Sequence, residues 1–354
     1  MFIFQTVASR SIQSLIAHIT IAAQGFIIAP ILIKITGPNL LGDYSIIMLL
    51  LVLIFSFSSL GVGTLYKRYL PGIEDKIEKT NLFYPQLFFN ILSALFLSLI
   101  LILINNFFLS SFKIFPEKFL IFLFPMHLIS HLLFSQTMNY FRYTNRSEYF
   151  SIASTINPIL SLSLIYFFYI IFNEISLNFI ILSHSISNIL LAKILYVKIF
   201  LEIQFKFCLP NTIMIKKEVK VGLPLILSTL SIILIEGGDR FIISILMNSS
   251  AVGSYVAAYM VGSIILIFPK VLGIVVPTMI AKRYDNKDQE GAKNLIDKSS
   301  KIFLIFSIPF FCGSIVLGQN ILELFTNVEI ASEAWLIIPL IGLASIFYGL
   351  TMIE

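Results

Sequence analysis

The chain has 354 residues, of which 58% are hydrophobic and only 12% are charged, and its mean hydropathy is +0.94. These values exclude an ordinary soluble globular protein of this length. The net charge of +5 gives no support for nucleic-acid binding, because the basic residues lie mainly in loops where they meet anionic lipid headgroups. Two cysteines, Cys208 and Cys312, provide neither a disulfide framework nor a metal site.

Apolar stretches recur along the whole chain, and each is long enough for a helix across roughly 30 Å of hydrocarbon. We therefore predict an all-α polytopic membrane protein with about ten transmembrane helices. The predicted spans are residues 11–33, 42–64, 81–104, 118–138, 150–171, 174–196, 222–246, 251–277, 300–318 and 332–354. Because no cleavable signal pattern precedes the first span, we expect that span to remain as an anchor.

The basic residues indicate how the chain is oriented. Of the 24 Lys and Arg residues, the predicted outer loops contain only Lys34, Lys113 and Lys118, and the spans contain Arg240 and Lys270. By the positive-inside rule, the N-terminus and every even-numbered loop are cytoplasmic, and we expect a multi-pass protein of the bacterial inner membrane. The loops are too short to hold a soluble domain, so we expect the function to lie within the membrane.

An internal repeat relates the two ends of the chain. Each copy has a Gly-x-Tyr motif, an apolar helix and a basic pair before Tyr, in the order Gly42-x-Tyr44 with Lys67-Arg68-Tyr69, then Gly253-x-Tyr255 with Lys282-Arg283-Tyr284. Six spans separate the copies, so the halves should be related by an axis along the membrane normal, as in transporters with parallel repeats. We predict a six-helix lobe at 1–200, a cytoplasmic linker at 201–221 and a four-helix lobe at 222–354. Chance similarity among apolar helices is the alternative.

The seventh span contains charges that the bilayer should exclude. A charge at the centre of a transmembrane helix costs about 2.5 to 3.5 kcal/mol on insertion scales, so such residues are usually functional. Glu236, Asp239 and Arg240 surround a Gly pair at 237–238, and their spacing places Glu236 on the same face as the other two. We expect Arg240 to bind an anionic substrate while the carboxylates hold Arg240 or bind a coupling cation. A Glu236–Arg240 pair that only joins helices is the alternative.

Four further residues are substrate-binding candidates. Gln24 aligns with Asp239 in the repeat, and Lys270 follows Pro269 in the eighth span. Arg68 and Arg142 lie at predicted cytoplasmic helix ends, where a guanidinium can hold phosphate oxygens. Lys270 can instead extend its amine to the interface, and the two arginines can simply anchor the topology.

The four histidines fall within predicted spans, namely His18, His127, His131 and His184. His127 and His131 are four residues apart and share one helix face. A proton relay is one interpretation, because imidazole titrates near neutrality. Hydrogen bonding between helices is the other interpretation. The sequence predicts no metal site, because a third ligand is missing, and no catalytic residue.

Several short motifs together resemble a known family. They are Gly42-x-Tyr44, Gly222-Leu223-Pro224, Asp239-Arg240-Phe241, Gly253-x-Tyr255 and the polar segment 282–301. The chain resembles the Wzx-type oligosaccharide flippases, in the polysaccharide transporter branch of the multidrug/oligosaccharidyl-lipid/polysaccharide exporter superfamily. The resemblance implies a MATE-like fold, no cofactor, coupling to a proton or sodium gradient, and a lipid-linked oligosaccharide of the O-antigen or capsule type as cargo. Membrane lipids and other surface-glycan assembly proteins are the further partners that it implies.

The chain departs from that family in its number of spans. Members usually have about twelve in two six-helix lobes, so we expect this chain to be a truncated product with an incomplete second lobe. A cation-coupled small-molecule antiporter of the same fold is the first alternative function. A glycan polymerase or ligase is less consistent with the sequence, because it would need a substantial outer loop or an acidic metal motif. A purely structural role is a further alternative.

Overall fold

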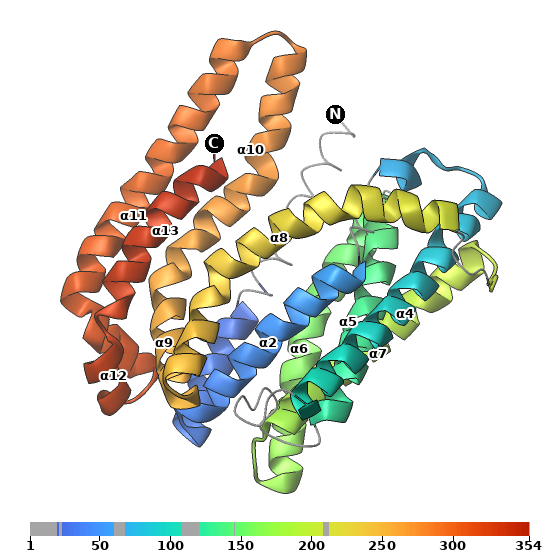
Figure 1. Ribbon diagram of the computed structural model, residues 1–354. Helices are drawn as coiled ribbons and strands as arrows, with labels where there is room; N and C mark the ends of the chain where they lie inside the picture. Colours follow the sequence, from blue (N-terminus) through green and yellow to red (C-terminus); the bar gives the residue numbers. More distant parts are fainter. Residues whose placement is uncertain are drawn as a thin grey trace. The chain divides into compact units, whose positions relative to one another are not determined.

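The protein is helical throughout the part that the computed structural model describes, which comprises residues 20, 23–59, 68–107, 120–144, 146–207 and 212–353. These residues contain no strand, which confirms the predicted all-α class. After a first helix at Ala23–Thr36, the elements (Figure 1) are α2 (Pro38–Ser59), η1 (Leu70–Gly72), α4 (Lys76–Phe107), α5 (Leu120–Tyr143), α6 (Ser147–Phe172), α7 (Leu177–Glu202), α8 (Thr212–Leu246), α9 (Ser249–Gly262), η2 (Ser263–Leu266), α10 (Ile267–Asp285), α11 (Gln289–Phe325), α12 (Val328–Ala334) and α13 (Ile337–Ile353).

Within the described residues, seven helices are long and apolar enough to cross a membrane, and eight are if α12 and α13 count as one bent span. The protein is therefore a multi-pass membrane protein. Part of the predicted first span, 11–33, lies outside the described residues, and its second half falls in the helix Ala23–Thr36. The predicted last span is broken, because α12 and α13 meet at an angle of 55°.

Two predicted connectors are largely helical. The predicted linker at 201–221 overlaps α8, which begins at Thr212, and the predicted loop at 278–299 overlaps α10 and α11, which are separated by only a short turn. Hydropathy ends a span where charged residues begin, but backbone hydrogen bonding continues a helix beyond that point into water. The Asp288 side chain caps α11 by accepting a hydrogen bond from the Gly291 N–H at 2.9 Å.

The chain divides into two compact units. Unit 1 comprises the residues up to Gly42 together with Ser249–Glu354, and unit 2 comprises Asp43–Asn248. This division groups the residues differently from the lobes predicted at 1–200 and 222–354. The lobe boundaries and the predicted orientation in the membrane therefore stay predictions.

Unit 2 is built around a bundle in which α5 packs against α4, α6 and α7 (Figure 1). At one end of this bundle the core is aromatic, with Phe83, Tyr84, Tyr140 and Phe141 almost completely buried. Their rings meet edge to face, for example Phe83 on Tyr140 with centroids 5.4 Å apart. Outward-facing residues are apolar as well, as expected for a lipid-facing surface, and Phe96, Phe122 and Phe167 are each more than half exposed.

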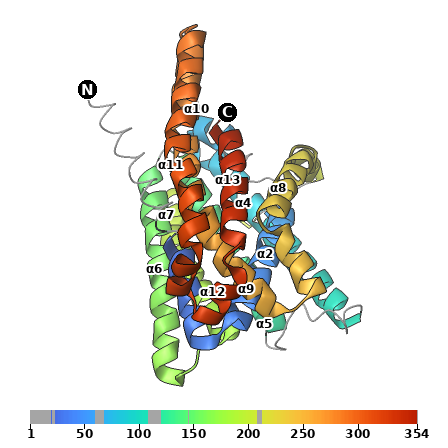
Figure 2. The same ribbon diagram turned by 90° about the vertical axis from the view of Figure 1, so that its left-hand side faces the viewer.

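In unit 1, α11 packs along α13 and α10, and Figure 2 shows α11 and α13 side by side. The amine of Lys34, just before the end of the first described helix, donates a 2.6 Å hydrogen bond to the carbonyl of Leu324 in α11. The 3-10 turn η2 interrupts the predicted eighth span shortly before Pro269. Pro269 has no N–H to donate to the carbonyl of Ile265, four residues earlier, which accounts for a break at this point.

The repeated glycines Gly42 and Gly253 form a reciprocal helix crossing inside unit 1. A Cβ atom at Gly42 would overlap the carbonyl of Ser249, and one at Gly253 would overlap the carbonyl of Pro38. Pro38 and Ser249 each lie four residues before the glycine of their own copy. Exchanging the two copies therefore turns one contact into the other, as expected if a local two-fold axis relates them. Only glycine permits such a close approach of two backbones.

Candidate functional site

The three charged residues predicted in the seventh span lie within two turns of α8. Glu236, Asp239 and Arg240 are each half-buried, in a helix whose neighbouring residues are mostly apolar. The backbone N–H of Arg240 donates a 2.8 Å hydrogen bond to Oδ1 of Asp239. This side-chain oxygen competes with the helical carbonyl for the same N–H, a local bond that weakens the regular helix pattern. The three charged side chains are therefore partly exposed on the surface of α8.

The glycine beside these charges is a point of close packing. A Cβ atom at Gly237 would overlap the side chain of Leu49, which belongs to α2 in the same unit. A Cβ at Gly238 would only touch Leu234, at 3.4 Å. A neighbouring helix therefore approaches α8 closely at Gly237. This contact holds α8 against α2 at the level of Glu236 and Arg240.

The other predicted binding residues lie elsewhere. Arg142, at the end of α5, and Arg68 are exposed, and their guanidinium groups lie 5.0 Å from the Phe150 ring centroid and 5.4 Å from the Tyr69 ring centroid, respectively. Gln24 is half-buried and Lys270 is exposed, and both belong to unit 1. The seven candidates are thus distributed over both units, with one local cluster on α8.

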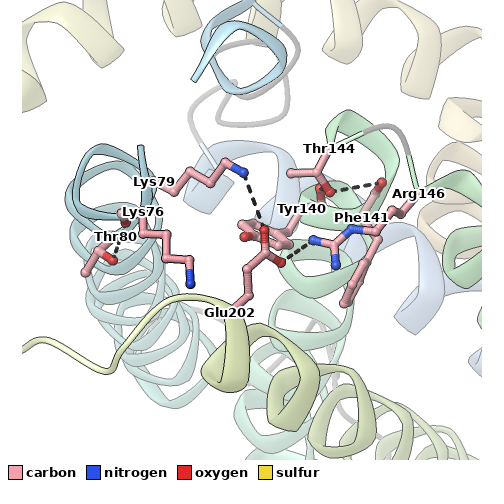
Figure 3. A network of polar contacts seen from close by, with 8 residues as sticks. All are labelled: Lys76, Lys79, Thr80, Tyr140, Phe141, Thr144, Arg146 and Glu202. Carbon is pink, nitrogen blue, oxygen red and sulfur yellow. Dashed lines mark hydrogen bonds and ion pairs between the residues drawn. The ribbon is translucent and has the colours of Figure 1, made fainter. Parts of the chain in front are cut away.

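A second charged cluster, which we call the Glu202 cluster, joins the ends of α4, α5 and α7. Figure 3 shows the Glu202 carboxylate between Lys79 and Arg146, with Tyr140 beside it. One carboxylate oxygen accepts a hydrogen bond from Arg146, and the other lies 3.4 Å from the Lys79 amine. The three side chains keep 16% to 33% of their surface exposed. The Arg146 guanidinium also lies 5.0 Å from the ring centroid of Phe141.

The Glu202 cluster is not predicted from the sequence. The positive-inside rule places Lys79 and Arg146 on the cytoplasmic side by their charge alone, and it gives Glu202 no role. One available signal was a single carboxylate close to three lysines, since Glu202 lies among Lys193, Lys198 and Lys206. All members of the cluster fall at helix ends that the positive-inside rule places on the cytoplasmic side. Because Glu202 pairs with both Arg146 and Lys79, the cluster holds these helix ends together.

Metal binding has no geometric support in the described part of the chain, where no three His, Cys, Asp or Glu side chains are grouped as ligands. An apolar pocket in unit 1, with a volume of about 10 Å³, is lined by side chains such as Phe26, Pro30 and Met260 and offers no charged group. The charged residues of α8 therefore stay the best candidates for contact with a polar substrate.

Comparison with known families agrees with this architecture. Residues 8–282 match the family described as polysaccharide biosynthesis protein, and residues 224–353 match the MatE family. The first match covers more than half of the chain. No curated protein sequence matches this chain.

Solved transporter structures share the fold. A multidrug resistance MATE family transporter of the MOP superfamily in an inward-facing conformation aligns with a TM-score of 0.64 at 14% identity, over 96% of this chain and 81% of that one. A MATE protein in the straight conformation aligns with a TM-score of 0.60 at 13% identity, over 98% and 80%. The MATE multidrug transporter DinF-BH gives a TM-score of 0.56 at 17% identity, over 91% and 74%. The predicted MATE-like fold is confirmed.

Proposed function

Because the chain belongs to the polysaccharide biosynthesis protein family, we propose that it is a transporter that moves a lipid-linked oligosaccharide from the inner to the outer leaflet of the bacterial inner membrane. The cargo class is an undecaprenyl-diphosphate carrier bearing an O-antigen, capsule or similar surface-glycan unit. The polyprenyl tail remains in the lipid while the sugar-diphosphate head passes through the protein. The N-terminus is cytoplasmic in this proposal, and other surface-glycan assembly proteins are its partners.

The half-buried charges on α8 are the observation that supports this cargo. A transporter of apolar molecules would gain nothing from Arg240 in an apolar helix, since an intramembrane charge is costly unless it is used. A guanidinium offers a planar pair of N–H donors that matches phosphate oxygens, and its charge persists at every physiological pH. Glu236 lies one turn before Arg240, where its carboxylate can hold the guanidinium in place while no substrate is bound.

Basic residues at the predicted cytoplasmic side would gather the diphosphate before it reaches Arg240. Arg68 and Arg142 are exposed, and the ring contacts of Arg142 leave its guanidinium at the surface. Arg146 and Lys79 differ, because Glu202 already holds both in ion pairs. We therefore assign the gathering role to Arg68 and Arg142 alone, with Lys270 and Gln24 as later contacts in unit 1.

The transport mechanism in this proposal is alternating access, in which the substrate is exposed first to the inside and then to the outside. The repeated Gly-x-Tyr motifs support it, because parallel repeats are an architecture of transporters.

The decisive test is translocation of a fluorescent undecaprenyl-diphosphate oligosaccharide in proteoliposomes. We expect the wild-type chain to flip the lipid and Arg240→Ala to flip it about 10 to 100 times more slowly, the size expected for losing a charge-assisted pair of hydrogen bonds. Arg240→Lys should show an intermediate rate because it keeps the charge but loses the planar fork.

Lys220→Ala is the matched control, because Lys220 is an exposed basic residue on the same helix. It should leave the rate unchanged. Equal rates for wild type and Arg240→Ala would remove Arg240 from the mechanism, and failure of the wild type to flip the lipid would refute the flippase proposal.

A cation-coupled antiporter for small molecules is the second candidate, favoured by the fold shared with multidrug transporters. In this case Glu236 and Asp239, and not Arg240, would contact the substrate. The same vesicles loaded with an organic cation distinguish the two functions. Efflux lost in Glu236→Gln and Asp239→Asn but retained in Arg240→Ala would favour the antiporter. If both amide variants kept gradient-dependent flipping at the wild-type rate, neither carboxylate would bind the coupling ion.

A further inference from the structure

Histidines from separate helices meet inside unit 2. His127 on α5 and His184 on α7 have ring centroids 6.1 Å apart, and both side chains are buried. Nδ1 of His127 lies 3.0 Å from the Ser185 hydroxyl, and Nε2 of His184 lies 3.2 Å from the hydroxyl of Tyr44 on α2. The histidines that the sequence assigned to separate spans therefore form one cluster that joins three helices.

His131 adds a nitrogen without a hydrogen-bond partner. It lies one turn after His127 on α5, and its ring packs edge to face on Phe55 of α2, with centroids 4.7 Å apart. Nδ1 of His131 is buried, and the described residues provide no partner for it. A buried polar atom without a partner costs free energy and is rare in folded proteins, so it usually indicates a function or a bound water molecule.

The histidines differ from the other buried polar side chains of the described residues in their ability to bind a proton. The buried polar side chains of the described residues are Ser, Thr, Asn, Gln and His, and they include no Lys, Arg, Asp or Glu. Histidine is the member of this set whose charge changes near neutral pH. Among the buried polar side chains of the described residues, only the imidazoles can therefore bind a proton.

Further unpartnered groups lie on the helices around the cluster. Gln86, Asn90 and Ser98 occupy the buried side of α4, and Gln136 is buried on α5, which packs against α4. The amide atoms of Gln86 and Asn90, the hydroxyl of Ser98 and Oε1 of Gln136 have no hydrogen-bond partner among the described residues. Buried water molecules typically satisfy such groups. A hydrated interior would give protons a route to the histidines, which an apolar bundle would not.

We propose that His127, His131 and His184 form a proton-binding site inside unit 2, and that its protonation and deprotonation drive the transport cycle. This inference rests on the proposed transport function and names protons as its coupling ion. One proton adds to an imidazole lone pair from one side of the membrane and leaves to the other side, with no other bond made or broken. A proton on one imidazole disfavours a second on its neighbours, so the cluster acts as one site.

The Tyr44 contact links this site to the glycine crossing. When Nε2 of His184 is unprotonated, it accepts a hydrogen bond from the Tyr44 hydroxyl, and protonation there removes that acceptor. Tyr44 lies two residues after Gly42, so the bond fastens the start of α2 to α7 next to the crossing. The titratable groups in this contact set are Tyr44 on α2 and the three imidazoles on α5 and α7. The polar groups that α4 and α6 contribute nearby, such as Asn90 and Asn157, are neutral.

Transport under defined gradients tests the proposal. Proteoliposomes containing the full chain are assayed for oligosaccharide flipping with no gradient, with a pH gradient and with a sodium gradient. We expect the pH gradient to accelerate wild-type flipping about tenfold, within the usual range of coupling energies. His127→Gln, His131→Gln and His184→Gln should lose this acceleration, because glutamine retains hydrogen bonding and cannot hold the proton.

Asn188→Ala is the matched control, since it removes the 2.8 Å hydrogen bond from Asn157 to Asn188 one turn after His184. It should keep the acceleration by the pH gradient. Acceleration of the wild type by sodium alone, or by protons equally in all three glutamine variants, would overturn the proposal. Absence of wild-type flipping under every condition would instead refute the flippase function.

Proton uptake tests the site even without transport. The wild-type protein in lipid nanodiscs and the triple variant H127Q/H131Q/H184Q are titrated from about pH 8 to about pH 5, the range in which imidazole changes charge. The titration is continued to about pH 4, below the ordinary imidazole range, and over the whole range we expect the wild type to take up one more proton per chain than the triple variant. Equal uptake would overturn the proposal whatever the transport assay shows. Thermal unfolding of both proteins verifies that the variant is folded.

Discussion

The two repeated helix starts, at α2 and α9, are alike in backbone contact and different in side-chain chemistry. Gly42 and Gly253 each meet the carbonyl of a residue in the other copy. Two residues further on, the Tyr44 hydroxyl contacts His184, whereas the Tyr255 ring lies 6.0 Å from that of Tyr259 in its own helix. The two copies share the geometry of the crossing, but their tyrosines contact different residues.

The predicted cytoplasmic helix ends of the two units differ as well. Unit 2 has the partly buried Glu202 cluster, and unit 1 has an Arg283–Asp288 pair at 2.6 Å whose side chains are 42% and 47% exposed. A shared fold therefore does not require shared electrostatics. The charged side chains differ where the backbone contact does not depend on them.

The largest effect is expected from alanine at either glycine of the crossing. Gly42→Ala and Gly253→Ala should each destabilise the protein by about 3 kcal/mol, because a Cβ meets a backbone carbonyl that cannot rotate away. Equal losses in thermal stability and flipping rate would support the symmetry of the crossing. Gly313→Ala is the control, since open space surrounds Gly313 and alanine favours a helix. A tolerated Gly253→Ala would disprove the reciprocal contact.

Loss of the Glu202 carboxylate should produce the next largest effect. Glu202→Ala leaves Arg146 and Lys79 unpaired, and we expect about 2 kcal/mol of destabilisation, less than for a fully buried pair because water screens these side chains. Thermal unfolding in detergent measures it. Flipping per folded molecule should stay at the wild-type rate, and a rate that fell with unchanged stability would show that the cluster binds substrate.

In the second copy, Asp288→Ala should cost about 1 kcal/mol. The expected loss comes mainly from the helix cap on the Gly291 N–H, because an exposed ion pair contributes little. Asp288→Asn keeps the cap and loses the charge, so its melting temperature should remain close to wild type. A large loss in the asparagine variant would mean that the Arg283 pair matters more than its exposure suggests.

The smallest effect on stability separates the two tyrosines. Tyr44→Phe removes one neutral hydrogen bond to His184 and should cost about 1 kcal/mol. It should also alter the pH dependence of flipping if the histidine site couples to the crossing. Tyr255→Phe is the comparison, because its position in the repeat is equivalent, and flipping in this variant should keep the wild-type pH dependence. If Tyr44→Phe and Tyr255→Phe changed the pH dependence of flipping in the same way, the two tyrosines would not differ in function.

Much of the architecture could be predicted from composition and pattern. The all-α class and the apolar helices are visible along the chain, and the fold and family comparisons agree with them. The Gly-x-Tyr repeat is visible in the same way. The helical parts of the predicted connectors were missed, because a polar helix outside the membrane has no hydropathy signal.

Hydropathy, charge and motif spacing are properties of neighbours along the chain, so the sequence by itself determined the membrane class, the repeat and the charged helix α8. The contacts between distant residues depended on how each helix rotates and packs against others, which no local pattern records. Only the tertiary structure brought His184 to His127 and Tyr44, paired Glu202 with Arg146 and Lys79, and crossed Gly42 with Gly253. Packing selects one face of each helix, and that selection depends on all the surrounding helices together.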